Sequence, residues 1–364
     1  MKALHASIAT AGAGGALAWV LFAMVTSLTH AAQPVVKADM AGIVYTADEQ
    51  GDSISAVDLA SGHVRIVPVA ISPHNVKITA DGTRLLAVGE PAAEGHGRAE
   101  AGHAAKEAKG RLLVFNADKL PSAPLASIPV GLHPAHVVVD QAGRQAFVTN
   151  AGDNAVAVVD LAKRTVVRTV PVGRYPHGLR ISPNGREVYV ANVEDGSVSV
   201  IDTAKLVETV RIPVGRAPVQ VGFTPDGNRV YVSLRDENSV AIVDTASRTK
   251  IGTVVVGRGP IQVHATPDAR FIYVANQGSD AEPGDTVSVI EVATGNVIDT
   301  IRTGKGAHGV AVSTDGKFVF VTNIVAGTVS VIDASTRTVV AAFGVGKGPN
   351  GVTFRPGGRK GAPS

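Results

Sequence analysis

Short runs of apolar or alternating residues fill most of the chain after residue 40, and turn residues separate them. In the first stretch the runs cover 43–47, 54–59, 64–69 and 73–79, with Gly, Asp or Pro between them. Short runs with β-branched or alternating apolar positions are typical of β-strands. The pattern therefore predicts four consecutive strands in this stretch.

This four-strand unit repeats along the chain. One aromatic or apolar residue marks the same point of each unit: Tyr45, Leu86, Phe147, Tyr189, Tyr231, Tyr273 and Phe320. The steps between these markers are 41, 61, 42, 42, 42 and 47 residues. A period near 42 with two insertions indicates a repeat architecture, and four strands per repeat match a blade of a β-propeller.

The end of the repeat region predicts how the ring closes. The chain ends with 350–354, a strand of the fourth type that no further unit follows. If the fourth strand of each unit is the innermost strand of a blade, this last strand completes blade 1 and removes free sheet edges. We therefore expect an all-β, seven-bladed β-propeller of four-stranded antiparallel blades over 41–357, with 358–364 as a loose tail.

Two sets of turn residues accompany the strands. Pairs such as Asp81-Gly82 and Asn184-Gly185 follow the fourth strand and supply the positive φ that a two-residue hairpin needs. A second acidic or amide position follows the second strand, as at Asp58, and is expected to bond the backbone of its own turn. We assign neither set to catalysis.

Composition narrows the class of protein. Aromatic residues make up 4% of the chain, and the formal net charge is +3. A charge this near zero and few rings for base stacking make nucleic acid an unexpected partner. The chain has no cysteine, which excludes disulfides, thiolate metal sites, iron–sulfur clusters and cysteine nucleophiles.

The N-terminus carries targeting information. Lys2 precedes an apolar run over 11–28, and Ala31 and Ala32 offer a cleavage point. This order is typical of a secretory signal peptide, which we assign to 1–32. The run of 18 residues is also just long enough to span a bilayer, so an uncleaved anchor stays open. In both cases we expect the propeller in the periplasm or elsewhere outside the cytoplasm, and membrane contact only through an uncleaved segment.

Four segments carry a family resemblance. They are Phe147-Val148-Thr149-Asn150, Tyr189-Val190-Ala191-Asn192, Tyr273-Val274-Ala275-Asn276 and Phe320-Val321-Thr322-Asn323. They resemble the YVTN-type β-propeller repeat of surface-layer and periplasmic proteins and, more distantly, the haem-carrying propeller of cytochrome-type nitrite reductases. The resemblance covers about 315 residues and departs at 85–88 and 232–234. It implies an architecture and a compartment but no mechanism.

Basic residues recur on one predicted face. The chain direction places the links into the inner strands on the same face as the loops after the YVTN-type strands, and we call this face the top. Five of these links carry a cation after their glycine: Arg174, Arg216, Arg258, Lys305 and Lys347. With Asn350 of blade 1 they form a candidate ligand-binding rim, because a ring of like charge focuses its field on anions. The alternative is that these residues are solvated surface charges without a function, which recur because the repeats arose by duplication.

Histidines gather on the same face. His74, His177 and His308 occupy one repeat position at the end of the link, and His136 lies one position further along in blade 3. By blade order they form an arc on one side of the propeller, with Asn350 between His308 and His74. Neutral imidazole binds zinc, copper and haem iron. The arc is therefore a candidate metal or haem site, and loop or packing roles are the alternative.

An insertion over 90–109 interrupts a top-face loop of blade 2. It is rich in Ala, Glu and Lys, and a short helix would place His96, Glu100, His103 and Glu107 on one face. Two imidazoles and two carboxylates could bind Zn(II) or Cu(II). Because two glycines weaken such a helix, a solvated loop is the alternative.

Motifs of known catalytic classes are missing from the sequence. The chain has no phosphate-binding loop, G-x-S-x-G elbow, H-E-x-x-H pair, EF-hand loop or Cys-x-x-Cys-His haem attachment. We therefore expect an exported, monomeric binding or scaffold protein whose top face holds an anionic small molecule or an envelope protein partner. The alternative is a metal- or haem-dependent protein, with a redox role open, whose His arc binds Cu, Zn or haem. An enzyme that uses the arc for acid–base chemistry ranks third.

Overall fold

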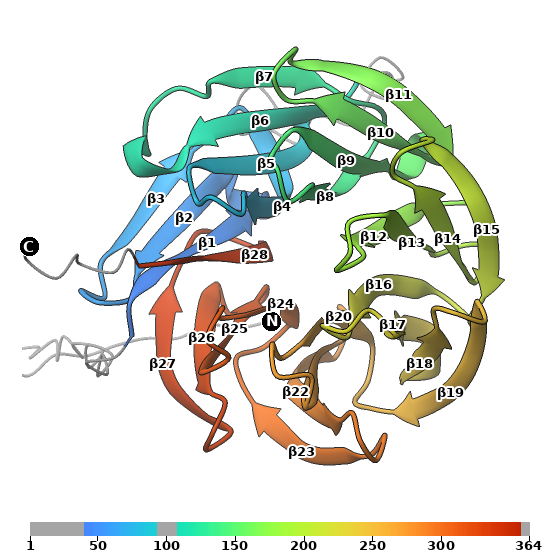
Figure 1. The fold of residues 1–364 in the computed structure, drawn as a ribbon. Helices are drawn as coiled ribbons and strands as arrows, with labels where there is room; N and C mark the ends of the chain where they lie inside the picture. Colours follow the sequence, from blue (N-terminus) through green and yellow to red (C-terminus); the bar gives the residue numbers. More distant parts are fainter. Residues whose placement is uncertain (1–39, 93–107, 358–364) are drawn as a thin grey trace, which may run out of the picture. The chain divides into compact units, whose positions relative to one another are not determined.

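The computed structural model describes residues 40–92 and 108–357. The predicted signal segment, most of the insertion with His96 and His103, and the tail over 358–364 lie outside the described residues. Within them, seven four-stranded antiparallel sheets stand around one centre, as Figure 1 shows. The predicted seven-bladed β-propeller is therefore confirmed.

Each blade consists of four strands that lie side by side from the central channel to the outer rim. From the channel outward, blade 1 contains β28 (Pro349–Pro356), β1 (Gly42–Asp48), β2 (Ser53–Asp58) and β3 (Val64–Pro68). Blade 2 contains β4 (Ile71–Ile78), β5 (Arg84–Pro91), β6 (Arg111–Asn116) and β7 (Ala126–Pro129). Blade 3 contains β8 (Pro134–Val139), β9 (Gln145–Asn150), β10 (Ala155–Asp160) and β11 (Thr165–Pro171). Blade 4 contains β12 (Pro176–Ile181), β13 (Glu187–Asn192), β14 (Ser197–Asp202) and β15 (Val207–Pro213).

The last three blades follow the same order. Blade 5 contains β16 (Pro218–Phe223), β17 (Arg229–Leu234), β18 (Ser239–Asp244) and β19 (Thr249–Val255). Blade 6 contains β20 (Pro260–Ala265), β21 (Phe271–Gly278), β22 (Pro283–Glu291) and β23 (Val297–Arg302). Blade 7 contains β24 (Ala307–Val312), β25 (Phe318–Asn323), β26 (Thr328–Asp333) and β27 (Thr338–Gly344). Short 3-10 helices η1 (Glu49–Gly51), η3 (Ala117–Lys119), η4 (Ala151–Asp153) and η5 (Arg235–Glu237) lie in loops.

The C-terminal strand closes the ring, as predicted. β28 pairs antiparallel with β1, from Gly42 opposite Pro356 to Asp48 opposite Pro349. The innermost strands contact one another in the cyclic order β28, β4, β8, β12, β16, β20, β24 and back to β28. Because the last strand completes the first blade, every blade packs against two neighbours.

The hydrophobic core consists of layers between neighbouring blades. The marker residues of the repeat lie in these layers; Tyr189, for example, is fully buried and packs with Val221 and Val232 of the next blade. Replacing a buried aromatic side chain with alanine typically costs about 3–5 kcal/mol of unfolding free energy. The repeated aromatic position is thus explained by packing between blades.

The Thr and Asn of the YVTN-type segments also have structural roles. The Thr149 hydroxyl accepts a hydrogen bond from the His136 N–H at 3.0 Å and donates one to the His177 carbonyl at 2.6 Å in the next blade. The Asn192 amide donates to the hydroxyls of Ser197 and Ser199 on β14. These bonds fasten the inner strand of one blade to its own sheet and to the following blade.

The turns after the innermost strands differ from the predicted two-residue hairpins. The Thr79 N–H donates to the Arg84 carbonyl, so four residues form the loop, and the Gly82 N–H donates to the Thr79 carbonyl within it. Gly82 has φ of 71°, so the positive φ is present as expected. The Asp58 carboxylate accepts the N–H groups of its own turn, as predicted.

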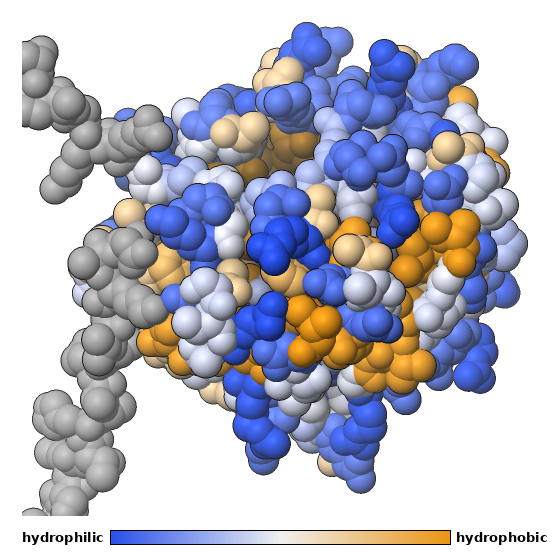
Figure 2. Space-filling view, turned by 60° about the horizontal axis from the view of Figure 1, so that its bottom comes forward, coloured by the Kyte–Doolittle hydropathy of each residue, from blue (hydrophilic) through white to orange (hydrophobic). Residues whose placement is uncertain are grey.

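The outer strands leave apolar side chains at the surface. Figure 2 shows one flank of the propeller, on which apolar patches lie between hydrophilic side chains. The exposed apolar residues include Ile66 on β3, Ile251 on β19 and Ile298 on β23. Among the described residues, no helix combines the length and the apolar character that crossing a bilayer requires.

Candidate metal centre

A β-bulge at the start of each innermost strand shapes the top of the channel. The pairing register shifts there in all seven blades, for example between Pro176 and Leu179 on β12. A bulge leaves extra residues outside the ladder and changes the direction of their side chains. The bulge directly follows a proline, Pro73 on β4, Pro134 on β8 and Pro176 on β12. Both residues after this proline can therefore reach the channel. This explains why His136, the second residue after its proline, meets His74 and His177, which are the first.

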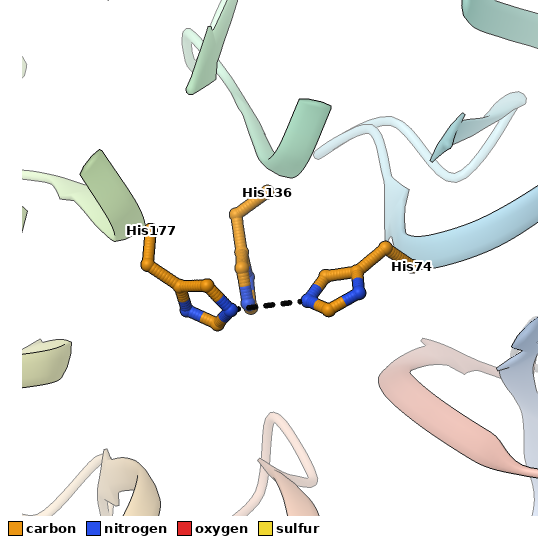
Figure 3. A group of neighbouring side chains, drawn as sticks. All are labelled: His74, His136 and His177. Carbon is orange, nitrogen blue, oxygen red and sulfur yellow. Dashed lines mark hydrogen bonds between the residues drawn. The ribbon is translucent and has the colours of Figure 1, made fainter. Parts of the chain in front are cut away.

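Three imidazoles from three blades converge at this point. His74 on β4, His136 on β8 and His177 on β12 each offer a ring nitrogen, and these nitrogens all lie within 4.8 Å of one another (Figure 3). The Nε2 atoms of His74 and His177 are 3.1 Å apart. The ring centroids are 4.9 to 5.6 Å apart. Of the sequence-predicted histidines, these three form one cluster.

Polar groups behind the rings orient the cluster. The His74 Nδ1 lies 3.0 Å from Glu49 Oε1, and the His177 Nδ1 lies 3.3 Å from the Val219 carbonyl. The amide of Gln220 approaches the His136 Nδ1 at 3.4 Å. Carboxylate and carbonyl partners of this kind fix the tautomer and the direction of metal-binding imidazoles.

One nitrogen in the cluster has no partner. The buried His136 Nε2 makes no hydrogen bond to any described residue, and His136 is only 1% exposed. A buried polar atom without a hydrogen bond is costly and needs a physical explanation. A ligand held between the rings would satisfy this atom.

Burial keeps His136 and His177 in the neutral form that binds metals. Desolvation, aided by the neighbouring His74 and His308, lowers the pKa of His177 to about 3. Desolvation and the neighbouring imidazoles also lower the pKa of His136 well below its usual value. For Glu49, burial opposes ionisation, but His74 and Asn350 outweigh it and lower its pKa to about 2. At neutral pH the site therefore combines the neutral imidazoles of His136 and His177 with the carboxylate of Glu49 behind His74.

A cavity opens above the cluster. Its volume is about 280 Å³, and its lining includes His74, His177, Glu49, Tyr175 and Glu90. His74 is 21% exposed at its side chain, whereas His136 lies deeper. One side of the cluster thus faces a space that could hold water or a small ligand.

His308 and Asn350 lie beside the cluster. The His308 Nδ1 is 3.0 Å from Gln277 Oε1, and its Nε2 has no hydrogen-bond partner in the described part of the chain. The Asn350 amide donates to Glu49 Oε2 at 2.6 Å. Asn350 therefore supports the carboxylate behind His74.

The predicted basic rim is largely paired. Arg174 forms an ion pair with Asp195 at 2.7 Å, Arg216 lies 3.8 Å from Glu237, and Arg258 pairs with Glu282. Lys305 and Lys347 have no carboxylate partner within residues 40–92 and 108–357. Exposed pairs of this kind contribute only about 0–1 kcal/mol each, but they reduce the free positive charge of the rim.

Sequence reasoning did not single out two residues of the site, Glu49 and Gln220. Glu49 follows the first strand at a position of mixed character: blades 3, 4 and 7 have Ala151, Val193 and Ile324 there, whereas blades 2, 5 and 6 have Glu90, Arg235 and Gln277. Gln220 belongs to a layer of polar residues one position after the His position, with Asn75 and Gln262. The amides next to the histidine position were the available signal for Gln220, whereas Glu49 does not stand out because three other blades are also polar at its position.

Two family models match the chain. The model described as cytochrome D1 heme domain matches residues 58–261, which are 204 of the 364 residues. The model described as YNCE-like beta-propeller matches residues 228–360. No curated protein matches the chain significantly.

Several solved structures share the fold. A protein of unknown function from Desulfotomaculum acetoxidans has a TM-score of 0.71 at 16% identity, over 87% of this chain and 100% of its own. The periplasmic gluconolactonase of Pseudomonas aeruginosa has 0.68 at 19% identity, over 86% and 98%. The hydrazine synthase of Kuenenia stuttgartiensis has 0.64 at 20% identity, over 79% and 96%. At these identities the likeness concerns the fold alone.

Proposed function

We propose, from the premise that this chain belongs to the family of the cytochrome D1 heme domain, that it is a metal-binding β-propeller. In this proposal His74, His136 and His177 hold one zinc or copper ion at the top of the channel. The single observation that carries it is the convergence of three imidazole nitrogens within 4.8 Å, from the innermost strands of three consecutive blades.

The chemistry of the donor set supports a bare ion. Bond lengths of ~2.0–2.1 Å place two nitrogens on a tetrahedral zinc ion roughly 3.3 Å apart, close to the 3.1 Å between His74 and His177. Three protein ligands leave a fourth position open, as in catalytic rather than structural zinc sites. That position would face the cavity of about 280 Å³, where the ion could polarise a bound water or carbonyl group.

A haem suits this arrangement less well, although the family match suggests it as the second candidate. A haem iron would be held by one or two protein side chains. Three rings whose centroids are 4.9 to 5.6 Å apart cannot all bind such an iron. A haem would use one imidazole at most on this side and would have to displace the others.

The proposal also includes the cellular compartment, which is outside the cytoplasm. The apolar segment over 11–28 favours export, and in an oxidising compartment a site built from histidines needs no reduced thiols. The top-face lysines Lys305 and Lys347 would draw anionic ligands toward the open position.

Metal titration tests the proposal. Protein comprising residues 33–364 is stripped with a chelator and titrated calorimetrically with Zn²⁺ and Cu²⁺. We expect about one equivalent to bind. His177→Ala should weaken binding by more than the roughly 10–100-fold that loss of an outer-shell partner costs.

The matched control is His133→Ala. His133 is exposed and pairs with Glu90 beside the same cavity, but it is not in the cluster. Its variant should bind the metal like the parent protein. A parent that binds neither ion, or equal affinity in both variants, would overturn the proposal, and a Soret band in protein purified from haem-replete cells would favour the haem instead.

A further inference from the structure

The innermost strands carry a second group of polar side chains below the histidines. At the position opposite the marker residue of the adjacent strand, Lys77 lies on β4, Arg180 on β12 and His264 on β20. The other four blades have small or neutral residues at this position: Val138, Gly222, Ala311 and Thr353. Blades 2 and 4 thus bring two cations to one level of the channel.

These side chains line a cavity of their own. Its volume is about 370 Å³, and residues of the innermost strands of six blades line it. Gln262 and Thr353 add an amide and a hydroxyl to its wall. Asp140 also lines it, but its carboxylate already accepts the Arg144 N–H at 2.6 Å. The cavity therefore combines largely apolar walls with two cations and one carboxylate.

The two cations lack a counter-charge. Within the two described stretches of the chain, no carboxylate lies within 4.0 Å of Lys77 or Arg180. Arg180 donates one hydrogen bond, to the Leu179 carbonyl at 3.0 Å, so most of its five donors stay free. Burial lowers the pKa of Lys77 to about 8 and that of Arg180 to about 10. Both side chains are half-buried, and a partly desolvated charge without a partner is unfavourable unless something binds it.

We propose that the lower part of the channel binds a small oxyanion, a phosphate or a carboxylate, between Lys77 and Arg180. The planar guanidinium of Arg180 suits two parallel hydrogen bonds to such a group, and Lys77 supplies a second point charge. His264 closes the wall; its Nδ1 is engaged with the Ala265 carbonyl at 2.9 Å. This site does not depend on the metal centre, because it uses different residues at a different level of the channel.

Calorimetric titration of the metal-free protein with inorganic phosphate tests the proposal, with succinate as a parallel probe at matched ionic strength. The variants are Lys77→Met and Arg180→Met, which keep an unbranched apolar stem and remove the charge. We expect saturable binding of at least one probe, weakened about ten- to a hundredfold in each variant, since charge-assisted hydrogen bonds are lost. Lys163→Met, which removes an exposed cation that pairs with Asp160 in the turn between the two outer strands of blade 3, should leave binding unchanged.

Thermal unfolding provides the second readout. Without an added anion, both channel variants should unfold at the same or a higher temperature than the parent, because an unpaired, half-buried charge is gone. Phosphate or succinate should raise the unfolding temperature of the parent but not of the variants. Binding of succinate alone would assign the site to carboxylates, and binding of phosphate alone to phosphates. The absence of saturable binding by both probes, or equal binding in parent and channel variants, would overturn the proposal.

Discussion

Among single residues, Asp48 stands out because it replaces the asparagine of the repeat with a buried carboxyl. Asn192, Asn276 and Asn323 occupy the same position in other blades and donate to hydroxyl groups. Asp48 instead accepts hydrogen bonds from Thr46 at 2.7 Å and Ser55 at 2.6 Å. Burial nevertheless raises its pKa from 3.8 to about 6.

The raised pKa makes blade 1 sensitive to pH. The unfolded carboxyl ionises near 3.8 and the folded one near 6, so the folded state holds the proton in between and loses stability as pH rises through this window. The difference corresponds to at most about 3 kcal/mol. Asp48→Asn should therefore raise the unfolding free energy at neutral pH and flatten its pH dependence between 3.8 and about 6, measured by urea denaturation.

Asn192→Asp is the reciprocal control. It places a carboxyl in the same environment of blade 4, next to the hydroxyls of Ser197 and Ser199. It should lower stability at neutral pH and create the pH dependence that Asp48→Asn removes. An Asp48→Asn protein less stable than the parent at neutral pH would contradict this account of Asp48.

Part of the site was predictable at this scale and part was not. His74 and His177 stand out in the sequence because they break the apolar repeat at one position. His136 also belonged to the predicted arc, but the sequence did not show the bulge that brings a residue one position later to the same point. The pairing of Arg174 with Asp195 joins residues 21 apart in two loops of one blade, so a list of cations alone overestimated the free charge of the rim.

Among the elements, the innermost strands carry the side chains of the candidate metal centre. The adjacent strands hold these innermost strands in register. Thr149 on β9 bonds both the His136 N–H and the His177 carbonyl. Blade 7 repeats the arrangement, since Thr322 on β25 accepts from the Gly309 N–H at 2.7 Å and donates to the Asn350 carbonyl at 2.8 Å. One threonine hydroxyl thus couples two neighbouring blades.

Thr149→Val should loosen the cluster. Valine keeps the shape of threonine but leaves a buried N–H and a carbonyl unpaired, at a cost of about 1–3 kcal/mol of unfolding free energy. Because those groups belong to His136 and His177, affinity for the metal should fall as well, measured by denaturation and by titration. Thr322→Val should destabilise the protein similarly with a much smaller loss of metal affinity. Equal effects of the two variants on metal binding would mean that Thr149 does not position the cluster.

At the scale of the whole molecule, the channel depends on the closure of the ring of blades by the pairing of β28 with β1. The period of the marker residues and the isolated last strand were enough to predict seven blades and the pairing of β28 with β1. The sequence could not show which side chains meet across the channel, because residues on β4, β8 and β12 are brought together only by the curvature of the ring.

Removing β28 should abolish cooperative folding. A chain that ends at Gly348 leaves the pairing edge of β1 open and removes the contacts of β28 with β4 and β24. We expect aggregation or a broad, low-temperature transition by circular dichroism. A chain that ends at Gly357 keeps the strand and should unfold like the parent. A cooperative transition at the parental temperature without β28 would contradict closure as the basis of stability.

The most direct test of the metal centre is anomalous X-ray diffraction from crystals grown with zinc or copper, recorded at the absorption edge of the metal. The account predicts one strong peak at the top of the channel, ~2.0–2.1 Å from a ring nitrogen of each of His74, His136 and His177. The account would be contradicted by the absence of such a peak or by a metal peak only elsewhere on the chain. The density of a tetrapyrrole at this position would contradict it as well.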